Sequence, residues 1–318
     1  MRNNREVRNN LWHYFLSPIY MTVYELTDIL KKAFTSLQSK NPLRLAAATA
    51  FFTTFALPPI LIIIIQTFGL FYSSKAMQQG AFAQLANVLG RESSVDLFHI
   101  FNRFQQLAQN WLIAAAGFIF LLFIATTLFH VVRSSVNDIW CIKVEQHTGI
   151  GYYLKMRLKS VIVILLSGLI LAVQLLASGL QALLSNYIHQ IWSGYNSVLY
   201  RVVSQVIFVI IATGWFTMLF KYLANAHPGW KTAFAGGVFT GILFTAGKII
   251  LGLLLTFSNL KTIFGATGSF VLILLFVFYT SIIFYYGAAF TKTWSEEKGN
   301  KMRLEKHVYE YKVEEVKS

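Results

Sequence analysis

The chain has 318 residues and a net charge of +14, and 56% of its residues are hydrophobic whereas only 13% are charged. Soluble globular domains carry about 25% charged residues, so this composition excludes an ordinary soluble protein. The single cysteine, Cys141, also excludes an intrachain disulfide and a thiolate zinc site.

Six long apolar segments lie at residues 45–72, 112–132, 161–184, 200–220, 233–257 and 268–290. Each is long enough to cross a hydrocarbon core of about 30 Å, which needs about 20 helical residues. Backbone polar groups in lipid must be satisfied internally, so these segments predict six transmembrane helices. The predicted fold class is an all-α polytopic integral membrane protein. We expect a cytoplasmic N-terminal segment at 1–40, a six-helix transmembrane domain at 41–292 and a cytoplasmic tail at 293–318.

The positive charges alternate between loops. Most of the 27 Lys and Arg residues lie before the first apolar segment, within 133–160 and 221–232, or after residue 290. The intervening loops contain only Lys75, Arg91, Arg103, Arg201 and Lys261. This positive-inside pattern predicts cytoplasmic N- and C-termini. Topology therefore explains the basic composition without a nucleic-acid partner, and the basic loops can also hold anionic lipid headgroups.

Residues 19–37 carry apolar side chains at helical spacing, with charged residues on the other faces. This pattern predicts an amphipathic helix on the cytoplasmic membrane surface. Asn41 followed by Pro42 predicts a sharp start of the first transmembrane helix, because proline fits the first helical turn.

Pro58 and Pro59 lie in the middle of the first span. Two prolines remove two backbone hydrogen bonds, so they predict a kink or a break. The distortion is either structural and tolerated by packing, or a discontinuous helix at a substrate path, as in transporters.

The longest loop, 73–110, has a weak helical pattern at 76–89 and a stronger one that begins at Ser93 or Ser94. We predict a periplasmic helical hairpin between the first two spans. The short connections at 185–199, 221–232 and 258–267 predict antiparallel neighbours. The tail after Trp294 reads as a frayed cytoplasmic helix.

Small residues mark the fifth and sixth spans. Gly237 and Gly241 are four apart in the fifth, and Gly265, Gly268 and Gly287 lie at or near the ends of the sixth. Small residues let helices approach closely in lipid, so we expect the tightest packing between these two helices.

Lys248 is an ionisable residue inside the fifth span, and no span contains Asp or Glu. A charge within the membrane marks a functional site by default. Two arrangements are open. The lysine stem extends outward to the interface, or its ammonium faces a cavity and meets an anionic headgroup or substrate.

A polar cluster at the end of the second span contains His130, Arg133, Asn137 and Asp138, close to Trp140. Arg133 and Asn137 share a helix face because they are four residues apart. The cluster is either a positive flank with an interfacial tryptophan or a polar site at the cytoplasmic mouth of the bundle.

Signals for catalysis are weak. The seven histidines show no paired metal-ligand spacing, and the sequence has neither a P-loop nor a G-x-S-x-G motif. We therefore expect no enzyme activity, no catalytic residues, no metal and no cofactor.

Five stretches together resemble the YihY/BrkB family of bacterial inner-membrane proteins over about residues 40–292. They are NPLRLAAATAFFTTFALPP (41–59), VNDIW (136–140), HPGWKTAFAGG (227–237), FGATGS (264–269) and YYGAAFT (285–291). The resemblance implies six spans, a bacterial plasma-membrane location, an association with virulence and a suggested role in envelope lipid transport. It draws attention to Pro58, Asn137, Trp140, Lys248, Gly265 and Gly287. The family's older label, ribonuclease BN, is not supported, because the sequence lacks a histidine–carboxylate metal constellation.

The leading hypothesis is a transporter or flippase-like protein for an anionic envelope lipid or similar amphiphile. Lys248 and the Arg133 cluster would contact the charged headgroup, and Pro58 and Pro59 would allow the first helix to move. The alternative is a non-transporting envelope scaffold whose periplasmic hairpin binds another envelope protein.

Overall fold

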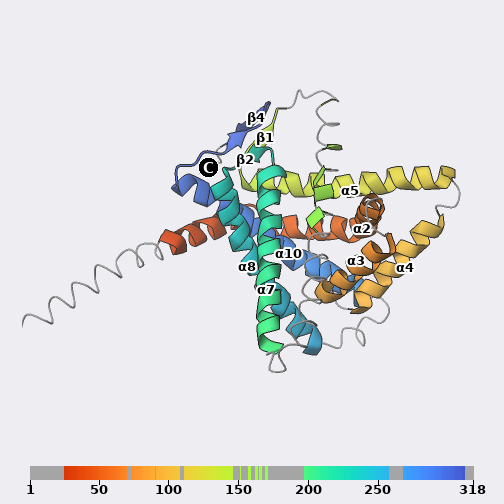
Figure 1. Ribbon diagram of the computed structural model, residues 1–318. Helices are drawn as coiled ribbons and strands as arrows, with labels where there is room; N and C mark the ends of the chain where they lie inside the picture. The colour runs from red at the N-terminus through yellow and green to blue at the C-terminus, as the bar shows by residue number, and fades with distance from the viewer. Residues whose placement is uncertain are drawn as a thin grey trace, which may run out of the picture.

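The computed structural model describes residues 25–69, 74–89, 91–107, 111–145, 197–257 and 268–311, with a few residues between 151 and 170. Most of these residues are helical (Figure 1). The helices are residues 25–38, α2 (Pro42–Gly69), α3 (Ser74–Leu89), α4 (Arg91–Leu107), α5 (Trp111–Ile139), α7 (Ser197–Tyr222), α8 (Trp230–Phe257) and α10 (Gly268–Glu297). The strands are β1 (Ile142–Val144), β2 (Ala226–His227), β3 (Arg303–Leu304) and β4 (Val308–Glu310).

Five of the six predicted spans coincide with long helices, namely α2, α5, α7, α8 and α10. The third predicted span, 161–184, lies largely outside the described residues. Within the described part of the chain, three helices are long and apolar enough to cross a membrane, at Gln205–Tyr222, Trp230–Leu251 and Phe270–Glu297. The number of six spans and the cytoplasmic location of the termini remain predictions.

Helix α10 is central in the arrangement, because it packs against α2 on one side and α8 on the other. Helix α7 packs on α8, and α5 packs on α2. The last turns of α5, α7 and α10 gather with the short strands at one end of the molecule, and α5 and α7 diverge from that end (Figure 1).

The most extensive helix contact is between α7 and α8, not between α8 and α10 as we expected from the glycines. Gly237 and Gly241, which are four residues apart on α8, both face α7. A Cβ atom at Gly237 would lie 2.8 Å from the Thr213 carbonyl oxygen and 2.9 Å from the Thr217 backbone nitrogen. A Cβ at Gly241 would lie 2.8 Å from the Thr213 hydroxyl. Only glycine permits these distances, so the two backbones approach closely.

Helices α8 and α10 meet through two reciprocal glycine–threonine contacts. Gly236 of α8 faces Thr291 of α10, and Gly287 of α10 faces Thr240 of α8. Each threonine hydroxyl donates to a carbonyl four residues earlier in its own helix, at 2.7 Å. The buried hydroxyls are therefore satisfied within their own helices. Gly268 is buried at the start of α10, whereas Gly265 lies outside the described residues.

The helix at residues 25–38 packs into the bundle through one face. Ile29, Ala33 and Leu37 are buried in the main hydrophobic cluster, whereas Leu26 and Phe34 are exposed. The Tyr286 hydroxyl of α10 donates to the Leu30 carbonyl oxygen at 3.1 Å. The predicted amphipathic helix is thus present over its described part, but its apolar face is divided between protein contact and an exposed surface.

Charged side chains also join this helix to the end of α10. Lys32 forms ion pairs with Asp28 at 2.7 Å and Glu297 at 2.6 Å, and Lys298 pairs with Glu25 at 3.2 Å. Hydrogen bonds to Asp28 and then Glu297 raise the pKa of the exposed Lys32 ammonium. Because these pairs are solvent-exposed, they orient the helix more than they stabilise it.

Helix α2 begins at Pro42, as the sequence predicted. Asn41 before it has φ +53°, a left-handed conformation that asparagine tolerates better than most residues. Its carbonyl oxygen accepts bonds from the Arg44 and Leu45 amides at 3.0 and 3.3 Å. The helix then continues through Pro58 and Pro59 to Gly69, so the structure shows no break at the two prolines.

Helices α3 and α4 form the predicted hairpin. Helix α4 begins at Arg91, slightly before Ser93 and Ser94, and both serines are buried in its first turn. The Ser94 hydroxyl donates to the Phe82 carbonyl oxygen of α3 at 2.7 Å. Phe82 and the fully buried Phe101 belong to a second hydrophobic cluster, which also contains Leu61, Leu251, Ile273 and Phe276.

The C-terminal tail forms strands, and our prediction of a frayed helix after Trp294 is wrong. Helix α10 ends at Glu297, and β4 then pairs antiparallel with β1 while β3 pairs antiparallel with β2. The His227 ring also contacts the Glu305 carboxylate at 3.0 Å. The fold is thus helical with two small sheets that attach the tail to the loops after α5 and α7.

We expect Gly237→Ala to destabilise the fold by about 1–3 kcal/mol, because the added methyl group overpacks the α7–α8 contact. Thermal unfolding of the detergent-purified protein measures this effect. Gly214→Ala on α7 is the matched control, since a Cβ there meets nothing within 4 Å. Its effect should stay within about 0.5 kcal/mol. Equal unfolding temperatures for the two variants would contradict the packing argument.

Candidate functional site

A partly open cavity of about 400 Å³ lies among the helices. Its described walls come from α2, α5, α7, α8 and α10, with Ile170 from the third predicted span. The other lining residues are Thr49, Thr53, Leu128, Phe129, Val132, Phe208, Ile211, Ala212, Trp215, Phe216, Leu219, Leu223, Phe244, Phe276, Val277, Thr280, Ser281 and Phe284.

The cavity is apolar and carries a few hydroxyl groups. Thr49 and Thr53 of α2 and Thr280 and Ser281 of α10 supply these hydroxyls. Thr49 is hydrogen-bonded to the fully buried Tyr285, and Ser281 donates to the Val277 carbonyl oxygen at 2.7 Å. A mostly apolar wall with few polar groups is typical of sites for small apolar or amphipathic ligands.

Lys248 lies beside the cavity but does not line it. Its ammonium nitrogen is 3.9 Å from the ring centre of Phe208, whose side chain does line the cavity. Phe208 is also stacked with Phe244, with ring centres 6.1 Å apart. A cation over an aromatic face is stabilised by the ring quadrupole, and more so where water is excluded. The aromatic ring thus separates the lysine charge from the cavity.

Arg133 and Asn137, which the sequence suggested as headgroup contacts, bind the protein backbone instead. Arg133 is 1% exposed, and its Nε donates to the Leu223 carbonyl oxygen at 2.6 Å. The Asn137 side-chain oxygen accepts a bond from the Asn225 amide at 3.1 Å. Both side chains therefore hold the turn after α7. These contacts support a structural role for the two residues.

His130 and Asp138 lie on the exposed side of α5, whereas Arg133 and Asn137 are buried. The four residues therefore do not form one site. Asp138 lies beyond the expected span end at residue 132. Burial raises the pKa of its carboxyl group, while the positive charges of Lys40, Arg44 and Lys143 act in the opposite direction.

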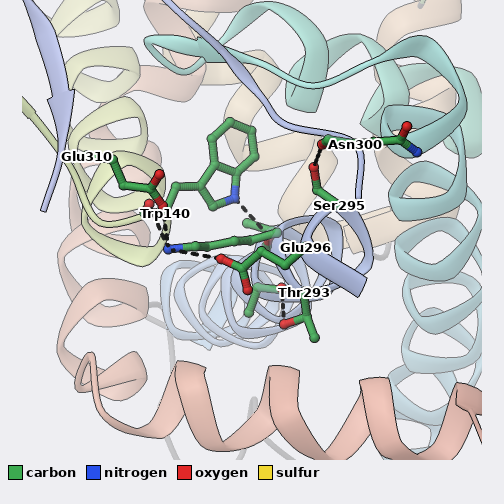
Figure 2. Close-up of polar contacts among 9 residues, drawn as sticks. Trp140, Thr293, Ser295, Glu296, Asn300 and Glu310 are labelled. Atoms are coloured by element: carbon green, nitrogen blue, oxygen red, sulfur yellow. Dashed lines mark hydrogen bonds and ion pairs between the residues drawn. The ribbon is translucent and has the colours of Figure 1, made fainter. Parts of the chain in front are cut away.

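Trp140 and Lys292 form a second polar network that the sequence did not reveal (Figure 2). The Trp140 indole N–H donates to the Ala288 carbonyl oxygen at 2.8 Å. The Lys292 ammonium donates to the Trp140 carbonyl oxygen at 2.9 Å and lies 3.6 Å from both Glu296 and Glu310. This network joins α5, α10 and β4. The four-residue spacing of Lys292 and Glu296 could have indicated this ion pair. It does so only if the last helix continues beyond residue 290, where the predicted span ended.

Within the described residues, no group of three or more His, Cys, Asp or Glu side chains is placed to hold a metal ion. The chemistry that the described cavity can offer is therefore apolar contact, hydroxyl hydrogen bonding and a nearby positive charge.

We expect Trp140→Phe to destabilise the protein by about 1–2 kcal/mol, because it removes a buried hydrogen bond and leaves space beside α10. Thermal unfolding in detergent again provides the measurement. Trp230→Phe is the control for the same chemical change, since Trp230 is 57% exposed. A control variant that is as unstable as Trp140→Phe would rule out the hydrogen bond as the cause.

Comparison with known proteins gives a family match. The model of the family described as virulence factor BrkB matches residues 33–311. Among curated relatives, a UPF0761 membrane protein of Teredinibacter turnerae is 27% identical over 281 residues, which cover 85% of this chain and 61% of the relative. A UPF0761 membrane protein of Saccharophagus degradans is 25% identical over 274 residues, covering 86% of this chain and 61% of that protein.

A third relative, a UPF0761 membrane protein of Pseudomonas aeruginosa, is 24% identical over 256 residues, which cover 76% of this chain and 57% of the relative. The chain thus spans about 60% of the length of the curated relatives it matches. No solved structure matches the chain.

Proposed function

Because the chain belongs to the virulence factor BrkB family, whose matched relatives are membrane proteins, we propose that it moves an anionic envelope lipid or similar amphiphile across the bacterial inner membrane. The observation that carries this proposal is the apolar cavity between α2, α5, α7, α8 and α10. A cavity of this kind among the helices offers an amphiphile apolar and hydroxyl contacts within the protein.

The size and lining of the cavity support an amphipathic ligand. Pockets that bind small molecules typically have volumes of about 300–1,000 Å³, and this cavity of about 400 Å³ falls in that range. Its aromatic and aliphatic walls can bury an acyl chain. The hydroxyls of Thr53 and Ser281 can accept or donate hydrogen bonds to the polar part of the same molecule.

The position of Lys248 supports an anionic rather than a zwitterionic ligand. A positive charge within a membrane span is costly, and it is stabilised when it meets an opposite charge. Here the ammonium lies directly against Phe208, one wall of the cavity. Displacement of the Phe208 ring would bring the lysine charge to a headgroup in the cavity.

Helix α2 supplies a segment that can bend during transport. Pro58 and Pro59 have no amide hydrogen, so the carbonyl groups four residues earlier lack their usual helical donors. Two other residues of α2, Thr49 and Thr53, line the cavity. Bending at the prolines would therefore move one wall of the cavity.

We expect Ala212→Leu to slow lipid movement by about tenfold or more, because the larger side chain fills part of the cavity. The rate is measured in proteoliposomes that contain a fluorescent phosphatidylglycerol, with chemical quenching of the outer leaflet. Ala246→Leu on the exposed face of α8 makes the same change outside the cavity and should leave the rate unchanged. Equal rates for the two variants would exclude the cavity as the lipid path.

Replacement of Lys248 tests the charge preference separately. Lys248→Ala should abolish the preference for phosphatidylglycerol over phosphatidylcholine, whereas Lys248→Arg should retain it, because the guanidinium keeps the positive charge. Both lipids are compared in the proteoliposome assay. A Lys248→Ala variant with an unchanged preference would remove Lys248 from the site.

The second candidate function is a non-transporting envelope scaffold. It is supported by the α3–α4 hairpin, on which Val95, Phe98 and Ile100 are 46%, 37% and 42% exposed. Such side chains can contact another envelope protein. Wild-type protein that inserts correctly in liposomes but moves no lipid would favour this function over transport.

A further inference from the structure

Three basic side chains from two parts of the chain lie near one end of α2. Lys40 precedes α2, Arg44 lies in its first turn, and Lys143 lies in β1. The ammonium nitrogens of Lys40 and Lys143 lie 5.5 and 4.8 Å from the ring centre of Tyr311. The Tyr311 amide in turn donates to the Cys141 carbonyl oxygen at 2.9 Å, which fixes the tyrosine beside β1. The tail therefore supplies the aromatic ring that both lysines contact.

The positive charge of these three side chains is larger than the negative charge of the carboxylate that faces them. Asp138 is the carboxylate on which Lys40, Arg44 and Lys143 all act. One carboxylate among three cations leaves a net positive charge in a small region, and like charges that share one aromatic ring repel each other. An anion with several oxygen atoms, such as a phosphate group, would relieve this repulsion and accept hydrogen bonds from the basic side chains.

An exposed apolar stripe begins at this basic cluster and follows α2. Leu43, Ala47, Phe51 and Phe55 recur every four residues, and all four are exposed. The rings of Phe51 and Phe55 lie 5.0 Å apart, and Phe55 contacts Phe270 of α10 at 6.2 Å. The stripe therefore consists of aligned side chains with no described protein segment covering them.

The stripe has the length of one lipid leaflet. From Arg44 to Phe55 the helix rises roughly 16 Å at about 1.5 Å per residue. That length is about half of a hydrocarbon core of about 30 Å. A phosphate held at Arg44 would therefore place an acyl chain along the stripe down to Phe55.

We propose that this outer face of α2 is a binding site for an anionic phospholipid, with its phosphate at Lys40, Arg44 and Lys143 and an acyl chain along Leu43, Phe51 and Phe55. The lipid bound there is a stable ligand of the protein surface. The site is separate from the cavity among the helices, and the proposal does not depend on transport.

The test is native mass spectrometry of the full-length detergent-purified protein, titrated with phosphatidylglycerol or with phosphatidylcholine. We expect preferential retention of phosphatidylglycerol by the wild type. The triple variant Lys40→Gln, Arg44→Gln, Lys143→Gln should lose at least about tenfold in apparent affinity for phosphatidylglycerol. Retention of phosphatidylcholine to the same extent as phosphatidylglycerol by the wild type would overturn the proposal.

A second triple variant controls for net charge. Lys31→Gln, Lys231→Gln and Lys306→Gln remove the same number of positive charges from other exposed positions. This control should change the affinity by less than about twofold, because none of the three residues belongs to the basic cluster and exposed charges are screened by salt. An equal loss in both triple variants would show diffuse attraction rather than a site, and would overturn the proposal.

Two further variants keep the test decisive if the first triple variant does not fold. Asp138→Asn removes the opposing carboxylate and should raise the affinity for phosphatidylglycerol. Phe51→Ala with Phe55→Ala changes only exposed side chains and should lower it. Excess inorganic phosphate should not displace the lipid, because phosphate alone makes no contact with the stripe. Full displacement by phosphate, or an unchanged affinity in the Phe51→Ala, Phe55→Ala variant, would contradict the acyl-chain placement. An unchanged affinity in Asp138→Asn would contradict the phosphate placement.

Discussion

The close approach of α8 to both of its neighbours is the constraint on which the bundle depends. Gly237 and Gly241 admit the α7 backbone, and the adjacent Gly236 admits Thr291 of α10. In lipid there is little hydrophobic drive for helices to associate, so such close packing supplies much of the attraction. With α7, α8 and α10 held together in this way, side chains of all three helices form walls of the cavity.

The end of the molecule that carries the short strands is rigidified by buried polar contacts. Arg133, Asn137 and Trp140 of the α5 region each bind a backbone group of another segment. A buried polar group without partners is costly, so each of these bonds fixes the segment that it contacts. This end borders the cavity, because Leu223, whose carbonyl oxygen accepts the Arg133 hydrogen bond, is one of the lining residues.

The C-terminal tail is attached to the end of the molecule that carries the short strands. Its strands pair with the loops after α5 and α7, and Lys292 links Trp140 to Glu310. The same tail brings Tyr311 against Lys40 and Lys143. The proposed transport path and the proposed surface lipid site therefore rely on different contacts: the first on helix packing, the second on the docked tail.

The sequence by itself determined the five long helices that the structure describes and the start of α2, because apolar length and the Asn41–Pro42 pair are local signals that act through the backbone. Gly237 and Gly241 likewise indicated that another helix packs closely against the fifth span. Only the tertiary structure decided that their partner is α7, that Arg133 and Asn137 point at backbone rather than ligand, and that Lys248 lies on Phe208. Each of these depends on how distant helices are oriented toward one another, and helical periodicity carries no information about that orientation.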